Sequence, residues 1–171
     1  MDLKKVFAFI EEKKGYEMPF RFKVRSGIPI ELDVHHKGTL VLSGYKNESL
    51  GDLKSVEKDL HLDKSTVKSL GNLERVGGSL YLMNSEIQSL GNLKYVGNNL
   101  SLNNCKIQSL GNLEYVGGAL TAMNSEIESL GNLEYVGGSF TLNKTPLSKK
   151  YTEDEIKQMV DVKGSIWSFP I

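Results

Sequence analysis

The stretch that decides the fold is "SLGNLKYVGNNLSLNNCKIQ", residues 89–108, because the chain repeats it with small changes. The next segment, residues 109–128, reads "SLGNLEYVGGALTAMNSEIE". Leucine, valine and isoleucine keep fixed places in both segments, whereas most residues between them vary. A fixed period of this length predicts a solenoid, in which each unit is one coil that packs on its neighbours.

The apolar positions hold a period of 20 residues over five units, between about residues 38 and 148. In the unit that begins at Ser89 they are Leu90, Leu93, Val96, Leu100, Leu102 and Ile107. The L-x-L pair has the alternation of a strand with one buried face. Burying six such side chains gains about 1.5–3 kcal/mol each, whereas ordering the backbone costs about 1–2 kcal/mol per residue. A single coil is therefore unstable, and we expect only the stacked array to fold.

This pattern, L-x-x-L-x-x-V-x-x-x-L-x-L-x-x-x-x-I, resembles the leucine-rich repeat family in a short form. The resemblance implies an α/β repeat solenoid dominated by strands, with right-handed coils and one concave parallel sheet. The family usually has asparagine or cysteine five residues after the first strand leucine. This chain instead has small side chains that can form hydrogen bonds: Ser65, Ser85, Cys105, Ser125 and Thr145.

The ends of the chain break the repeat, and a solenoid needs its open apolar ends covered. We expect one structural domain in three parts. Residues 1–37 form an N-terminal cap of a helix and a β-hairpin, residues 38–148 form the repeats, and residues 149–171 form a C-terminal cap. In the last part, Thr152 and Glu155 make the T-x-x-E capping box of a helix. A final strand follows, with Trp167 pointing outward.

Glycine recurs at two places in each unit, after the first leucine and before the L-x-L pair. Fixed glycines indicate a positive φ or a close approach of backbones. In the first full coil, Glu57 and Lys58 stand in place of the glycines that precede the L-x-L pair. We therefore expect that coil to turn differently at this point.

The composition narrows the classes of partner. Lys and Arg together equal Asp and Glu at 21 each, which argues against binding nucleic acid or anionic lipid through bulk charge. The single cysteine, Cys105, cannot form an internal disulfide and fits a reducing compartment. No apolar run is long enough to cross a bilayer. We expect a cytoplasmic protein, in the host cytoplasm if phage-encoded, with no cofactor, metal, small-molecule substrate, nucleic acid or membrane as partner.

The outward strand residues of successive coils form columns about 4.8 Å apart per coil. Two such columns mix tyrosine and methionine with small polar groups, a composition typical of protein interfaces; the alternative is a solvated sheet face. The predicted partner-binding residues are His61, Asp63, Tyr81, Met83, Asn103, Thr121, Met123, Thr141, Asn143 and Trp167.

A separate column, away from these two, contains Arg75, Tyr95, Tyr115 and Tyr135. Two interpretations stay open for it. The rings stack from coil to coil as structural cladding, or they form a second binding face.

The main functional hypothesis is a non-catalytic protein-binding scaffold that acts by occluding a surface. The sequence also looks like short leucine-rich repeat proteins of bacteria and phages, which suggests an inhibitor of a protein such as a bacterial immune effector. One alternative is a self-associating structural protein that dimerises through the Trp167 end or the tyrosines. Another is a hydrolytic enzyme centred on His61, with Asp59 and Asp63 beside it. His35, His36 and His61 give only a weak metal hypothesis.

Overall fold

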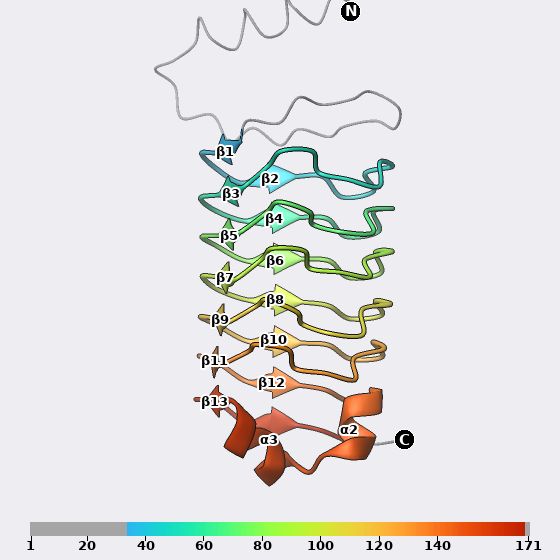
Figure 1. The fold of residues 1–171 in the computed structure, drawn as a ribbon, viewed down its shortest axis with the longest axis vertical. Coiled ribbons are helices and arrows are strands. Elements are labelled where there is room, and N and C mark those ends of the chain that lie inside the picture. The colour runs from blue at the N-terminus through green and yellow to red at the C-terminus, as the bar shows by residue number, and fades with distance from the viewer. Residues whose placement is uncertain (1–33, 170–171) are drawn as a thin grey trace, which may run out of the picture.

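The computed structural model describes residues 34–169, which form a β-solenoid of stacked coils (Figure 1). Each regular coil takes 20 residues: Leu60 pairs with Leu80, and Leu80 with Leu100. The predicted periodicity is therefore present in the structure. The predicted N-terminal helix and hairpin fall in residues 1–33 and lie outside the described residues.

Two parallel sheets, each of seven short strands, run along the stack. One sheet contains the odd-numbered strands: β1 (His35–His36), β3 (Ser55–Val56), β5 (Arg75–Val76), β7 (Tyr95–Val96), β9 (Tyr115–Val116), β11 (Tyr135–Val136) and β13 (Asp161–Val162). The other contains the even-numbered strands: β2 (Leu40–Val41), β4 (Leu60–His61), β6 (Leu80–Tyr81), β8 (Leu100–Ser101), β10 (Leu120–Thr121), β12 (Phe140–Thr141) and β14 (Ile166–Trp167). A return segment, such as residues 84–94, connects each even-numbered strand to the next odd-numbered strand and so completes the coil.

The even-numbered sheet is the one that the L-x-L pairs predict. The odd-numbered sheet was not predicted, since the sequence interpretation gave each coil a single strand. In β7, for example, Val96 is buried and Tyr95 is partly exposed. Two residues are too few to show a clear alternation in the sequence, although the stacked valines and tyrosines each form a column.

The interior consists of layers of apolar side chains, one layer per coil. Leu73, Val76, Leu80, Leu82 and Ile87 of one coil have no exposed surface. Because each layer is covered by the next, the leucine, valine and isoleucine columns join in one continuous core. This core leaves the outward strand side chains free to differ between coils.

The glycines serve two different purposes. Gly111 lies in the left-handed region at φ 58°, where glycine avoids the strain of a β-carbon. Gly97 permits close stacking, because a β-carbon there would lie 1.9 Å from the carbonyl oxygen of Gly77. The expectation that Glu57 and Lys58 would change the turn is wrong: residues 55–64 have the same strand and turn pattern as the later coils.

Two helices interrupt the repeat at the C-terminal end (Figure 1). Helix α2 (Pro146–Lys150) was not predicted; Thr145 caps it and Pro146 begins it. Helix α3 (Glu153–Met159) begins after Thr152, whose side chain accepts a hydrogen bond from the Glu155 N–H, as the T-x-x-E pattern predicts. The helices lengthen this coil, so Phe140 pairs with Ile166. Within residues 34–169, no helix combines the length and apolarity that a membrane span needs.

Candidate protein-interaction face

Two columns of side chains lie on the outward side of the even-numbered sheet, which we call the central face. One column contains His61, Tyr81, Ser101, Thr121, Thr141 and Trp167, and the other contains Asp63, Met83, Asn103, Met123, Asn143 and Phe169. The in-register parallel pairing places each member beside its counterpart in the next coil. All the predicted partner-binding residues therefore lie together on one surface.

Charge is absent from most of the central face. Asp63 carries a carboxylate in the first coil, but the ten residues of the later coils, from Tyr81 to Phe169, include no Asp, Glu, Lys or Arg. The whole chain has 25% charged residues, so this depletion sets the face apart. Depletion of charge at the centre of a patch is the compositional mark of a protein interface.

Large apolar side chains protrude from the same face. Met83 is 40% exposed, Met123 38%, Trp167 47% and Phe169 59%. Phe169 was not among the predicted residues. Its position two residues after Trp167, equivalent to that of Met83 after Tyr81, is the signal that would have found it. The rings of Trp167 and Phe169 lie 6.3 Å apart and form an aromatic cluster at the end of the face.

Three polar members of the central face also hold the backbone of the following coil. The side-chain oxygens of Asp63 and Asn103 accept hydrogen bonds from the backbone N–H groups of Met83 and Met123, at 2.9 and 2.8 Å. Asn143 accepts from the backbone N–H of Phe169 in the same way. These contacts fix the acceptors in place, and each one positions the exposed apolar residue of the next coil.

A polar rim borders this face where each even strand ends in a turn. Asn84, Asn104 and Asn124 occupy the left-handed region there. Their side chains form a ladder, in which the amide nitrogen of Asn104 donates to Asn84 at 2.9 Å and that of Asn124 donates to Asn104 at 3.1 Å. A centre depleted of charge, bordered by a polar rim, is the usual layout of an interface.

The His61 ring packs against an aromatic ring, and the carboxylates near it in the sequence bind backbone groups. Its ring stacks on that of Tyr81 with 4.6 Å between the centroids. Asp59 and Asp63, which the enzyme hypothesis uses to orient His61, accept hydrogen bonds from the backbone N–H groups of Ser79 and Met83. These contacts give both carboxylates a structural purpose in the coil stack.

The predicted column of Arg75 and the three tyrosines forms a continuous stack on the odd-numbered sheet. The ring centroids of Tyr95 and Tyr115 lie 4.9 Å apart, and those of Tyr115 and Tyr135 lie 4.8 Å apart. The Arg75 guanidinium covers one end of the stack at 3.7 Å from the Tyr95 centroid. The Lys163 ammonium lies 5.8 Å from the Tyr135 centroid at the other end, so cation–π contacts close both ends.

The small polar column is the set of side chains five residues after the first strand leucine. Its hydroxyl groups bond mainly within their own coil. The Ser85 hydroxyl donates to the Leu82 carbonyl at 2.6 Å, and Ser125 and Thr145 make the equivalent bonds. The Cys105 thiol reaches the coil before it and contacts the Leu82 carbonyl at 3.0 Å. Burial raises the pKa of the Cys105 thiol, which disfavours the reactive thiolate.

The histidines of the metal hypothesis lie on both sheets of the solenoid. The Nδ1 atom of His35 lies 2.8 Å from the Ser55 hydroxyl, while His61 lies on a different sheet. Across residues 34–169, no group of three or more His, Cys, Asp or Glu side chains is placed to hold a metal ion.

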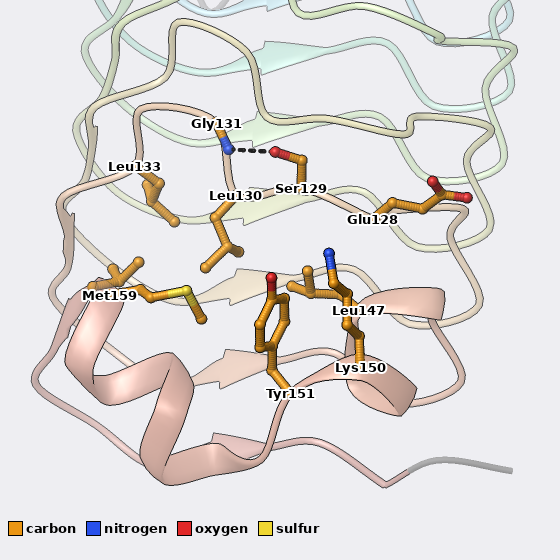
Figure 2. Close-up of a pocket in the computed structure, with 10 residues that line it drawn as sticks. Glu128, Ser129, Leu130, Gly131, Leu133, Leu147, Lys150, Tyr151 and Met159 are labelled. Atoms are coloured by element: carbon orange, nitrogen blue, oxygen red, sulfur yellow. Dashed lines mark hydrogen bonds between the residues drawn. The ribbon is translucent and has the colours of Figure 1, made fainter.

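A cavity of about 390 Å³ lies between the last regular return segment and the C-terminal helices (Figure 2). Leu130 and Leu133 line it from the coil, and Lys150, Tyr151 and Met159 line it from the helical side. The cavity exists because α2 and α3 replace the regular return segment that would otherwise cover Leu130. It was not predicted from the sequence.

Comparison of the chain with protein-family models, with curated proteins and with solved structures finds no significant match. The structure itself shows a repeat solenoid with a 20-residue period, which is compatible with a repeat family.

Proposed function

We propose that this chain is a non-catalytic scaffold of the leucine-rich repeat type, which binds a protein partner through the central face and acts by occluding the partner's surface. The observation that carries the proposal is the uncharged array from Tyr81 to Phe169, from which four large apolar side chains protrude. Two of its polar members, Asn103 and Asn143, are already held by hydrogen bonds to the next coil, so binding does not need to order them. Pre-organisation of this kind lowers the entropic cost of association.

The contact centres on Met83 and Met123 in this proposal. Methionine is flexible and polarisable, so it adapts to apolar surfaces of different shape. Tyr81 and Trp167 supply larger rigid contacts, and residues of these types carry most of the binding energy in many interfaces. The Asn84–Asn104–Asn124 ladder forms part of the polar rim.

A narrower form of the proposal follows from the resemblance to short repeats of bacteria and phages. In that form the chain is an inhibitor, and its partner is a protein such as a bacterial immune effector. The identity of a captured partner, and loss of that partner's activity when the chain is added, would test this form separately.

The test is affinity capture from a lysate of the organism that encodes the chain, followed by mass spectrometry. The variant Tyr81→Ala with Met83→Ala removes two large side chains from the second row of the face. A matched control is Glu86→Ala with Gln88→Ala, which lies on the return segment of the same coil. Capture by the wild type and the control, but not by the face variant, supports the proposal.

Tyr81→Ala also removes the stack with His61, which could by itself reduce capture. A second variant of the face therefore leaves this stack intact. Ser101→Lys places a charge inside the uncharged array, in the row next to Tyr81 and Met83, without changing the core. If both face variants keep their fold, shown by unchanged urea midpoints, and still capture the partner as the wild type does, the central face is the wrong surface.

A further inference from the structure

The even-numbered sheet ends at β14, whose outer edge has no strand beside it among residues 34–169. In earlier coils the first and third residues of this segment donate to the coil that follows. For example, the N–H groups of Leu60 and Leu62 donate to the carbonyls of Ser79 and Tyr81, at 2.9 and 2.7 Å. Ile166 and Ser168 occupy these positions in the last coil. Their backbone N–H and C=O groups therefore face the open edge.

Lys163 and Pro170 flank this two-residue edge strand, but the segment between Ser165 and Phe169 lacks two protections that natural sheets use. Exposed edge strands usually carry lysine, another inward-pointing charge or proline, which prevent pairing with a second chain. The residues from Ser165 to Phe169 contain no charge and no proline. They instead present the half-exposed side chains of Trp167 and Phe169. Such an edge is a template for the addition of another strand.

We propose that the occupant is a second copy of this chain, which pairs its β14 with the first in antiparallel orientation about a two-fold axis at Trp167. With this register Ile166 faces Ser168 of the other copy, and each such pair exchanges both N–H···O bonds. The two Trp167 residues form the non-hydrogen-bonded pair at the centre, with Cα atoms about 4.5 Å apart. The contact is isologous, as in most homodimers.

The charges of the C-terminal helices favour a second copy over an unrelated strand. Helix α3 packs beside β13, whereas α2 lies on the opposite side of the last coil (Figures 1 and 2). A two-fold axis perpendicular to the sheet exchanges these sides, so α3 of one copy faces α2 of the other. Helix α3 carries Glu153 and Asp154 in its first turn, and α2 carries Lys149 and Lys150 in its last turn. Only Tyr151 and Thr152 separate these two turns, so each copy presents a basic and an acidic turn side by side at this end. A two-fold axis can set the acidic turn of one copy against the basic turn of the other.

Dimerisation would make the two even-numbered sheets continuous and place both central faces on the same side. The chain would then present two copies of its uncharged face in one rigid unit. This inference does not depend on the proposed function, because it uses the edge of β14 rather than the outward side chains of the earlier coils.

The experiment measures mass by light scattering and Trp167 fluorescence over a range of protein concentrations. Trp167 is the single tryptophan of the chain, so its emission reports directly on this edge. We expect the mass to rise from monomer to dimer as the concentration increases, with a parallel shift of the emission to shorter wavelength. Added salt should weaken the dimer without abolishing it, because salt screens the contacts between the helices.

The key variant is Ser168→Pro, which removes a backbone donor from the edge, and its matched control is Ser168→Ala, which keeps that donor. The proline variant should be monomeric at concentrations where the alanine variant is a dimer. Trp167→Lys gives a second test at an exposed position, since like charges directly opposite each other repel. A wild type that stays monomeric up to its solubility limit would overturn the proposal, as would folded Ser168→Pro and Trp167→Lys variants that dimerise normally.

Discussion

A β-carbon on Gly97 would lie 1.9 Å from the carbonyl oxygen of Gly77, one coil earlier in the stack. Gly117 and Gly137 have the same relationship to the glycine one coil before each of them. Real atoms do not approach so closely, so a larger residue at these positions must push two coils apart. The coil spacing is set by the strand pairing, which leaves little room for such a shift.

We predict that Gly97→Asn destabilises the protein by about 1–3 kcal/mol or more, as overpacking does. The same substitution at Gly111 should cost only a few tenths of a kcal/mol, because asparagine tolerates the left-handed region and nothing lies within 4 Å of a β-carbon there. Urea unfolding of the two variants measures both values. Equal losses of stability would contradict the distinction between close approach and positive φ.

Two serines at equivalent positions of different coils give a second prediction. The Ser125 hydroxyl donates to the Ala122 carbonyl at 2.7 Å, whereas the buried Ser65 hydroxyl has no hydrogen-bond partner within residues 34–169. Ser125→Ala should therefore lower the free energy of unfolding by about 1 kcal/mol. Ser65→Ala should leave it unchanged or raise it, because the variant removes an unpaired buried polar atom.

Thermal and urea unfolding of the two alanine variants check this prediction under the same conditions. Both serines are almost fully buried, so differences in solvent exposure do not complicate the comparison. A Ser65→Ala variant that loses as much stability as Ser125→Ala would show that the Ser65 hydroxyl does have a partner in solution.

The sequence predicts those features of this fold that recur in every unit. Leucine, valine and isoleucine at fixed spacing specify the coil, its even strand and the surface that the outward residues share. The odd strands were missed because two residues, such as Tyr95 and Val96, do not make a visible pattern within one coil. Their hydrogen bonds depend on the neighbouring coil, which only the stacked structure supplies.

Features that occur once were harder to predict. Helix α2 follows Thr145 and Pro146, a cap and first-turn signal, but Thr145 also fits the small polar column of the repeat. Phe169 was missed, although Trp167 was predicted, because the second outward column was followed only as far as Asn143. The stacking of His61 on Tyr81 depends on side-chain orientation, which the two-residue period of a strand does not determine.

The tyrosine stack leads to a third prediction, which separates its two interpretations. Tyr115 contacts a parallel ring on each side, and each aromatic pair contributes about 0.5–1.5 kcal/mol beyond its buried area. Tyr115→Leu should therefore lower stability by about 1–3 kcal/mol, whereas Tyr115→Phe should keep most of it. If the stack is only cladding, both variants capture the partner normally once folded. Loss of capture by the stable phenylalanine variant would instead identify a second binding face.

The capping box of α3 gives a prediction about pH. The Glu155 carboxylate accepts hydrogen bonds from the backbone N–H and the hydroxyl of Thr152, at 2.8 and 2.9 Å. The backbone bond, followed by the side-chain bond, lowers the pKa of Glu155. A lowered pKa in the folded state means that the ionised carboxylate stabilises the helix above its unfolded pKa of about 4.3. This stabilisation is lost as the pH falls through the lower folded value.

Helix α3 should therefore open more readily in acid than the regular coils do. Hydrogen exchange of the amides in residues 153–159, followed from neutral pH to below pH 4 and corrected for the intrinsic rate, measures this opening. Glu155→Gln is the matched control, because its amide oxygen still accepts a hydrogen bond but does not titrate in this range. The wild type should lose protection of α3 relative to the glutamine variant only at the acidic end. Identical pH profiles for the two chains would show that the capping carboxylate does not govern the stability of α3.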